Sequence, residues 1–219
     1  MSIAENLKKI KSELGNEVTL VAVSKYSTDD EVMEAYEAGH RDFGENKAQD
    51  LKRRSDDFPK DIRWHFIGHL QRNKVKYIAD YIHMIHAVDS LKLLKEINKR
   101  AKKAERKIPC LLQMHIASEE SKFGLDHDEI MAMVSDKSLA EFENVAITGL
   151  MGMATNTENT DTIRTEFKTL KNLFDDINAT ETPAKVRMET LSMGMSNDYQ
   201  IALEEGTNSV RIGSAIFKD

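Results

Sequence analysis

Apolar runs and amphipathic segments alternate along this chain from one end to the other. A run of consecutive apolar residues predicts a strand buried on both faces of a sheet, whereas apolar residues spaced three or four apart predict a helix. The strand pattern occurs at 18–24, 42–45, 63–68, 84–89, 109–116, 145–153, 187–194 and 209–216. The helical pattern occurs at 2–15, 28–39, 90–107, 126–136, 162–178 and 196–206.

The eight strand-like runs predict parallel βαβ units, because a parallel connection needs a crossover that is usually a helix. Eight such units that close on themselves form a TIM (β/α)8 barrel, and the segment 2–15 is then an extra N-terminal helix. The alternative is an open doubly wound sheet, but no Gly-x-Gly-x-x-Gly turn follows the first strand. Because no linker or change of composition interrupts the pattern, residues 1–219 are predicted to form a single α/β domain.

Composition narrows the class of protein. The formal net charge of −6 argues against general affinity for nucleic acid. No stretch reaches the roughly 18 apolar residues of a membrane span, and the basic run at 99–107 is interpreted as the solvated face of a helix. The single cysteine, Cys110, excludes an internal disulfide and fits a reducing compartment. We therefore expect a cytoplasmic protein without nucleic-acid or membrane partners, and we expect it to be a monomer.

Polar residues follow the predicted strands at the end where a parallel barrel carries its active face. They are Lys25, Glu45, Asn46, the histidines of 65–69, Asp89 and His115. Aliphatic residues give way to polar or small ones at the same end of every strand. This repetition indicates a functional site at the carboxyl ends of the strands.

The segments that end the seventh and eighth strands are the most specific. "LSMGMSND" places Ser192, Gly194 and Ser196 where a strand passes to a helix, and "VRIGSAI" places Gly213 and Ser214 at the equivalent point. Glycines let the backbone approach a ligand closely, and amides that open a helix point towards an anion. Barrels commonly hold a phosphate in these two loops, so we predict phosphate binding here. Taken singly, each loop is also consistent with a turn and a helix cap.

Lys25 follows the first strand, where a lysine in a barrel mouth that excludes water is a nucleophile towards aldehydes. Its alternative role is an ion pair with Glu45 or Asp89. An amine opposite a phosphate site suggests a phosphorylated aldehyde, which is either pyridoxal 5′-phosphate (PLP) or a sugar phosphate. Arg211 favours PLP, because PLP proteins place an acid or an arginine against the pyridine nitrogen and strand alternation directs Arg211 into the barrel. The alternative for Arg211 is a salt bridge to a carboxylate.

Several segments resemble one known family. They are "AVSKYST", "FGENKAQ", "WHFIGHLQRNK", "HAVDS", "SKFGL", "GLMGMA" and "LSMGMSNDYQIALEEGTNSVRIGSAIF". They are similar to the YggS/PROSC family of PLP homeostasis proteins, and the similarity runs from about Val18 to Phe217. The family resembles the N-terminal barrel of bacterial alanine racemase in fold, which agrees with the predicted barrel.

The resemblance implies roles for individual residues. Lys25 forms the internal aldimine with PLP, Asn46 approaches the 3-hydroxyl side of the ring, and Arg211 lies near the pyridine nitrogen. The remaining implied residues are Ser192, Gly213 and Ser214, which hold the phosphate, and His65 and Met193, which line the pocket. Lys122 in "SKFGL" is a candidate secondary amine, and Lys47 stands where many relatives have an aromatic residue.

The resemblance also implies that the protein binds and delivers PLP and balances vitamin B6 and amino- and keto-acid pools, with PLP-dependent apo-enzymes as candidate recipients. Alanine racemases add a second domain that supplies a base on the other face of the cofactor, and we expect none here because the chain ends near its last strand. Since Arg211 weakens the cofactor as an electron sink, we expect no efficient turnover. A weak amino-acid racemase, in which Lys25 serves one face and His65 or His69 the other, stays open as an alternative. A Schiff-base aldolase is the third possibility.

Overall fold

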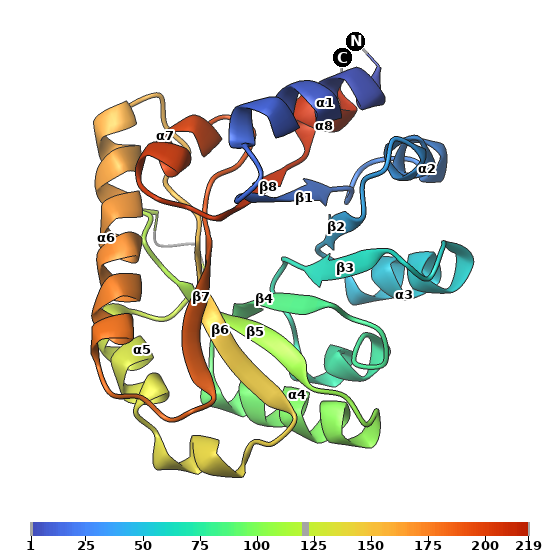
Figure 1. The fold of residues 1–219 in the computed structure, drawn as a ribbon. Helices are drawn as coiled ribbons and strands as arrows, with labels where there is room; N and C mark the ends of the chain where they lie inside the picture. The colour runs from blue at the N-terminus through green and yellow to red at the C-terminus, as the bar shows by residue number, and fades with distance from the viewer. Residues whose placement is uncertain (1, 120–122, 219) are drawn as a thin grey trace.

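The computed structural model describes residues 2–119 and 123–218 and confirms the predicted closed parallel barrel (Figure 1). Each strand pairs in parallel with the next, and β8 closes the barrel against β1. The strands are β1 (Thr19–Val23), β2 (Asp42–Glu45), β3 (Arg63–Phe66), β4 (Met84–Val88), β5 (Ile108–Met114), β6 (Val145–Gly152), β7 (Val186–Ser192) and β8 (Ser209–Ile212).

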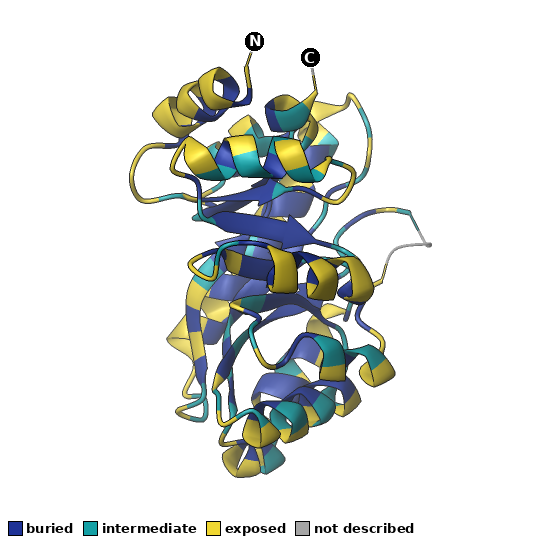
Figure 2. Cartoon of the chain, turned by 90° about the vertical axis from the view of Figure 1, so that its right-hand side faces the viewer, coloured by how far each residue is buried: buried dark blue, intermediate teal, exposed yellow. Residues whose placement is uncertain are grey.

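Helices follow the strands and cover the outside of the barrel, with their exposed faces turned to solvent (Figure 2). The α-helices are α1 (Ile3–Leu14), α2 (Asp29–Glu37), α3 (Ala48–Asp57), α4 (Leu91–Lys103), α5 (His127–Val134), α6 (Thr160–Ala179), α7 (Tyr199–Glu204) and α8 (Ser214–Phe217). Two 3-10 helices are η1 (Arg72–Tyr77) and η2 (Lys137–Glu141). The extra N-terminal helix α1 lies beside α8, where Nδ2 of Asn6 donates to the carbonyl oxygen of Ile216 at 3.0 Å.

Two differences from the sequence pattern bear on the carboxyl ends of the strands. Helix α3 lies where no helix was predicted, because its sequence AQDLKRRSDD carries too few apolar residues to show a helical period. The last predicted strand was expected to run through 209–216, but β8 ends at Ile212 and the helix α8 begins at Ser214. The prediction failed there because a short apolar run does not distinguish a strand from a buried helical turn.

Local capping signals fix where several helices begin. Capping boxes, in which a side chain at the cap and one three residues later each bond the other's backbone amide, start α1, α2 and α5. The box of α2 pairs Thr28 with Glu31. The loop between β1 and α2 is therefore confined to the few residues from Ser24 to Thr28, and it contains Lys25.

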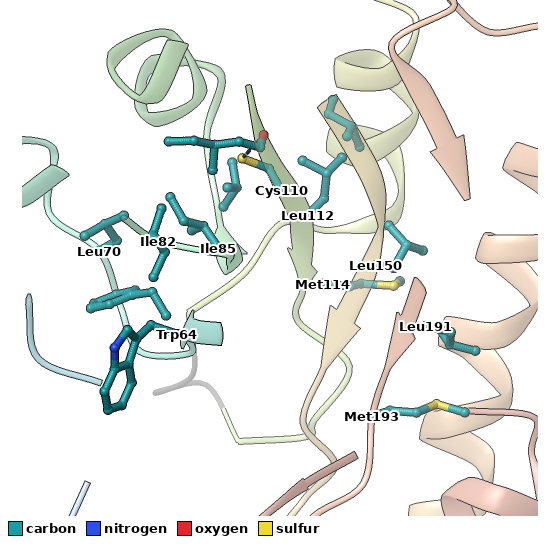
Figure 3. Packing of buried hydrophobic residues seen from close by; sticks show 14 of the residues in the cluster. Trp64, Leu70, Ile82, Ile85, Cys110, Leu112, Met114, Leu150, Leu191 and Met193 are labelled. Atoms are coloured by element: carbon teal, nitrogen blue, oxygen red, sulfur yellow. Dashed lines mark hydrogen bonds between the residues drawn. The ribbon is translucent and has the colours of Figure 1, made fainter. Parts of the chain in front are cut away.

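The apolar core lies mainly between the outer face of the barrel and the helices (Figure 3). A second, small cluster of buried apolar residues contains Ala87, Leu111 and Met151. Barrel interiors are usually filled by branched apolar side chains, yet this chain buries ionisable side chains on strands β2, β3, β4 and β8. The interior is therefore partly polar, and the way in which these polar groups satisfy one another bears directly on the site.

Candidate functional site

Lys25 lies in the turn that follows β1 and its side chain is exposed to solvent. Its Nζ is 5.1 Å from the centroid of the Tyr26 ring, which is itself exposed. The dehydrated amine that we expected is therefore not what the structure shows, because β1 ends at Val23 and Lys25 lies two residues beyond the shielded strand. Its proposed ion-pair partners are engaged elsewhere, since Glu45 pairs with Arg54 and Asp89 pairs with His69.

Arg54, on the inner face of α3, holds the loop that carries Lys25. Its NH1 donates to the carbonyl oxygen of Ser24 at 2.8 Å, and its NH2 donates to the carbonyl oxygen of Ser27. NH1 also bonds the buried carboxylate of Glu45, whose Oε1 accepts from Oγ of Ser24 at 2.7 Å. Burial raises the pKa of Glu45 even though these hydrogen bonds lower it. A buried arginine thus fixes both sides of the Lys25 turn.

The ends of β2 and β3 meet beside this turn. The register pairs Val23 of β1 with Gly44 of β2, so Lys25 and Asn46 follow neighbouring strand ends. Asn46 is half-buried and packs against Gly68, where an added Cβ would lie only 2.7 Å from the Cβ of Asn46. Glycine is needed at position 68 because no side chain fits in that contact. Asn46 is consequently held at the end of β2 by direct backbone packing.

The loops that follow β7 and β8 converge as the sequence predicted, but through a different serine. Oγ of Ser196 accepts from the backbone amides of Gly213 and Ala215, each at 3.3 Å. An added Cβ on Gly213 would lie 3.0 Å from the carbonyl oxygen of Val23, so this glycine lets β8 approach the end of β1. Two amides that point to one oxygen acceptor form an arrangement that suits a phosphate oxygen equally well. Ser214 is exposed and opens α8 in the same loop.

Ser192 and Arg211 lie deeper, inside the barrel. Arg211 is buried, and its NH1 donates to the carbonyl oxygen of Ser192 at 2.8 Å and to Oγ of Ser192 at 2.6 Å. Its NH2 donates to the carbonyl oxygen of Gly152 at 2.9 Å, so its hydrogen bonds go to neutral oxygens. Burial lowers the pKa of Arg211 to about 10, which still leaves it cationic at neutral pH. Alternation therefore placed Arg211 correctly, whereas Ser192 is an interior partner of Arg211.

Further hydrogen bonds lead from Ser192 through two histidines to an aspartate. Oγ of Ser192 lies 3.1 Å from Nδ1 of His86, and Nε2 of His86 lies 2.9 Å from Nδ1 of His65. Nε2 of His65 lies 3.1 Å from Oδ1 of Asp42, whose carboxylate also binds Arg63. We call the five residues from Arg211 to Asp42 the buried chain. His65 is thus a member of the buried chain.

Ionisation within the buried chain follows from burial and charge. Burial, aided by electrostatic interactions with His65 and Arg211, keeps the pKa of His86 well below its usual value. Burial opposes ionisation of Asp42, but the hydrogen bonds from Arg63 and His65 outweigh it and hold its pKa below the usual range. His86 is therefore neutral and Asp42 is an anion at neutral pH.

Of the remaining predicted residues, Met193 lies in the apolar core and Lys122 is outside the described residues. Met193 is fully buried in the large apolar cluster beside Leu191 (Figure 3), because alternation after Ser192 turns it away from the interior. The lysines of α4, at the start of the basic run, are exposed as predicted.

A PLP molecule can be tested against the groups present. Within the described residues, Nε of Arg211 makes no hydrogen bond, so one donor on a buried cation is left for an acceptor such as a pyridine nitrogen. The converging amides at Gly213 and Ala215 suit a phosphate, and Lys25 supplies a primary amine at the adjoining strand end. These three groups match the three ends of PLP.

Three side chains of types that bind metal ions lie close together near the amino ends of the strands. Ligand atoms of Asp42, His65 and His83 lie within 4.8 Å of one another. Arg63 bonds both carboxylate oxygens of Asp42, with Nε 2.7 Å from Oδ1. A cation would have to displace this guanidinium, so we assign the cluster to hydrogen bonding rather than to a metal.

Sequence reasoning missed three residues that organise the site, namely Arg54, His86 and Asp42. Ser196 was predicted as part of the phosphate loop after β7, but the family resemblance assigned the phosphate to Ser192. His86 interrupts the apolar run "MIHAV" and was interpreted only as part of a strand. Arg54 had no signal, because the helix that carries it was itself not predicted. A polar residue inside a buried strand is the signal that could have revealed His86.

Comparison with known proteins gives the family. Residues 1–219 match the model of the alanine racemase N-terminal domain family. The chain is 33% identical over 219 residues to the pyridoxal phosphate homeostasis protein of Aquifex aeolicus, covering 98% of this chain and 94% of the relative. It is 36% identical over 204 residues to the protein of the same name from Helicobacter pylori, covering 92% of this chain and 88% of that one.

A solved structure agrees closely. PipY of Synechococcus elongatus PCC7942, with PLP bound, has a TM-score of 0.88 and 31% identity, with 99% of this chain and 100% of that chain covered. Among the described residues, no helix has the length and apolar character needed to cross a membrane. The chain therefore belongs to the alanine racemase N-terminal domain family and, within it, to the pyridoxal phosphate homeostasis proteins.

Proposed function

We propose that this protein binds PLP at the carboxyl ends of its strands and contributes to PLP homeostasis by carrying or buffering the cofactor. The observation that carries the proposal is the register of β1 and β8, which brings the Lys25 turn beside the loop of Gly213. The names of its relatives and the PLP bound to PipY support it. The proposal includes a cytoplasmic monomer, with PLP-dependent apo-enzymes as the candidate recipients.

In this site each end of the cofactor has a partner. Lys25 would supply the amine that holds PLP covalently, and Asn46 would face the ring hydroxyl from the neighbouring strand end. The amides of Gly213 and Ala215, which donate to Oγ of Ser196 in this structure, would donate to the phosphate instead, and the Ser196 hydroxyl would donate to the phosphate beside them. We assign the serine of this loop as Ser196 rather than Ser192, because Ser192 is already bonded to Arg211 and His86. His65 and Met193 are left out of direct contact with the cofactor in this assignment.

The choice of arginine bears on the chemistry. Bound PLP supplies an electron-withdrawing ring, and its strength as an electron sink increases when the pyridine nitrogen carries a proton. Arg211 is a donor that stays cationic at neutral pH, so it would bond an unprotonated nitrogen and leave the ring a weak sink. This favours retention of PLP over turnover of an amino acid.

The test is covalent trapping. Purified protein incubated with PLP should become yellow, and borohydride reduction followed by peptide mapping should place the cofactor on Lys25. Lys25→Ala should abolish the adduct, while Lys47→Ala, at another exposed lysine beyond a strand end, should keep it. A preparation that stays colourless with excess PLP would overturn PLP binding, and an adduct on Lys122 would overturn the assignment of the amine.

A second measurement tests the phosphate loop. Ser196→Ala should weaken PLP binding roughly tenfold, because it removes a hydroxyl from the loop that faces a charged oxygen. Ser135→Ala, at an exposed serine after α5 and near the amino ends of the strands, is the matched control and should bind PLP normally. Equal affinity in both variants would remove Ser196 from the site.

The racemase alternative now depends on one histidine. His65 is committed to the buried chain, whereas His69 is exposed beyond β3, with Nδ1 3.2 Å from Oδ2 of Asp89 and its ring stacked on Phe123. Exchange of an amino-acid α-proton in deuterated buffer, well above free PLP and lost in Lys25→Ala, would support this alternative. Turnover of a sugar phosphate by a colourless protein would support the aldolase instead.

A further inference from the structure

The buried chain has a direction that its two ends dictate. Arg211 is a guanidinium and can only donate, whereas the carboxylate of Asp42 can only accept. Oγ of Ser192 already accepts from Arg211, so its own hydrogen is free to be given to Nδ1 of His86. As long as both histidine rings are neutral, each link of the chain then runs from Arg211 towards Asp42.

The ring nitrogens follow from this direction. Nδ1 of His86 accepts from Ser192, so the hydrogen of His86 is on Nε2, which faces Nδ1 of His65 at 2.9 Å. Nδ1 of His65 therefore accepts too, and its hydrogen on Nε2 is donated to Oδ1 of Asp42. With both rings neutral, each histidine thereby carries its hydrogen on Nε2. No other assignment of two neutral rings satisfies all four links at once.

Because the chain is buried, breaking any one of its hydrogen bonds is costly. His86 and Ser192 are fully buried and His65 is 3% exposed, so water does not replace a lost partner. A buried polar group without its partner costs more than the net gain of a formed hydrogen bond. The buried chain therefore acts as a unit, and a change at one end is transmitted to the other.

We propose that Asp42, His65 and His86 are positioning residues for the cofactor, because the buried chain fixes the direction of the Ser192 hydroxyl and, through it, the guanidinium of Arg211. This rests on the proposed function, in which Arg211 meets the pyridine nitrogen. The proposal makes the first residue of β2 and inner residues of β3 and β4 part of a site that opens at the carboxyl ends of the strands. It also predicts that one added proton has an effect at Arg211.

The effect of a proton is a reversal of direction. A proton from solvent that gives His65 a hydrogen on Nδ1 requires His86 to accept at Nε2 and to hold its hydrogen on Nδ1. Ser192 Oγ then accepts from both His86 and Arg211, and its own hydrogen must leave the chain. The groups that face the chain are Arg63 on Asp42, His83, whose ring centroid is 5.1 Å from that of His65, and Asp198 near Arg211.

The first experiment uses the protein without cofactor and without any substitution in the chain. In 15N-labelled protein, long-range 1H–15N correlation spectra report which ring nitrogen carries hydrogen. Between pH 7 and 8, His65 and His86 should both carry it on Nε2. Hydrogen on Nδ1 of either ring in that range would overturn the direction we assign, whether or not the protein binds PLP.

The second experiment measures coupling to the cofactor. The visible absorption of bound PLP is recorded as a function of pH in the wild type, His65→Asn, Ser192→Ala and the double variant, and the midpoint is the pH at which half of the absorption change has occurred. His65→Asn should move this midpoint by about 0.5–1 pH unit when Ser192 is present, which is the size expected for a perturbed hydrogen bond. The shift should vanish when Ser192→Ala has already broken the link. Equal shifts in both backgrounds would make His65 merely structural and refute the positioning role.

His40→Asn is the control for the second experiment. His40 is also buried, but it bonds the carbonyl oxygen of Asp42 from outside the chain, so His40→Asn should leave the midpoint unchanged. If His65→Asn does not fold, Asp42→Asn replaces it in the same cycle, since it removes the charge at the end of the chain. If the ring tautomers are as assigned but no PLP binds, the proposed function and the positioning role both fail while the direction of the chain stands.

Discussion

Removing Arg54 should destabilise the protein far more than removing its neighbour Arg53. The side chain of Arg54 is 6% exposed and that of its partner Glu45 is 1% exposed. Arg54→Met keeps most of the volume but deletes the bonds to Glu45, Ser24 and Ser27. It therefore leaves a carboxylate buried without its cation and frees the turn that carries Lys25.

The magnitude follows from the type of contact. Breaking a buried ion pair by removing one partner costs about 3–5 kcal/mol of the free energy of unfolding. For a chain of this size each kcal/mol lowers Tm by about 2–4 °C, so Tm should fall by roughly 6–20 °C. Arg53 pairs with Asp29 while its side chain is 51% exposed, and an exposed pair contributes at most about 1 kcal/mol. Arg53→Met should therefore lower Tm by no more than about 4 °C.

The sign of the pH dependence gives an independent check. Burial already raises the pKa of Glu45, and loss of Arg54 should raise it further, so the folded variant takes up a proton more readily than the unfolded chain. A raised carboxyl pKa adds stability at low pH that is lost as pH rises. The gap in stability between Arg54→Met and the wild type should consequently narrow as pH falls from 8 to 5.

Urea and thermal unfolding followed by circular dichroism measure all of these effects. Adding Glu45→Gln to Arg54→Met removes the stranded charge and should recover part of the loss. If Arg54→Met is no less stable than Arg53→Met, or if Glu45→Gln deepens the loss, the buried pair does not have the role assigned to it. The same variants assayed with PLP report whether the freed turn weakens binding by Lys25.

Three further predictions concern the scaffold. His40 is buried and its pKa is lowered to about 4 mainly by burial, so the unfolded chain binds more protons than the folded protein below pH 6.5, and the free energy of unfolding decreases as pH decreases. At pH 5 the His40 contribution to this loss is about 2 kcal/mol. Urea unfolding of His40→Asn should therefore show a shallower loss of stability than wild type between pH 7.5 and 5. Gly149→Ala should lower stability by about 2–5 kcal/mol or prevent folding, because φ is +156° and the new Cβ would lie 1.8 Å from the carbonyl oxygen of Thr190; Tm equal to wild type would contradict this. Cys110 should react with a thiol reagent only in denaturant, since burial raises the pKa of the thiol, and rapid labelling of the native protein would show that the core opens there.

The sequence by itself determined the architecture, because the signals that specify it are local. Apolar runs, helical spacing and capping residues act over a few neighbours, and they were enough to predict eight strands and a closed barrel. The placement of Lys25, Asn46, Gly213 and Arg211 at strand ends or inside the barrel also followed, since in a parallel barrel all strand ends of one kind meet on one face.

Only the tertiary structure decided how these residues are held. Ser192 ends β7 and Ser196 lies four positions later in the loop that follows. Closure of the barrel places the first against Arg211 and His86 and the second against the loop of Gly213. Hydrogen bonds between strands depend on stagger and depth within the barrel, which no local pattern encodes. The sequence did not reveal that Lys25 is exposed to solvent or that Arg54 bonds the turn that carries it. The reason is the same, because burial is a property of the assembled fold.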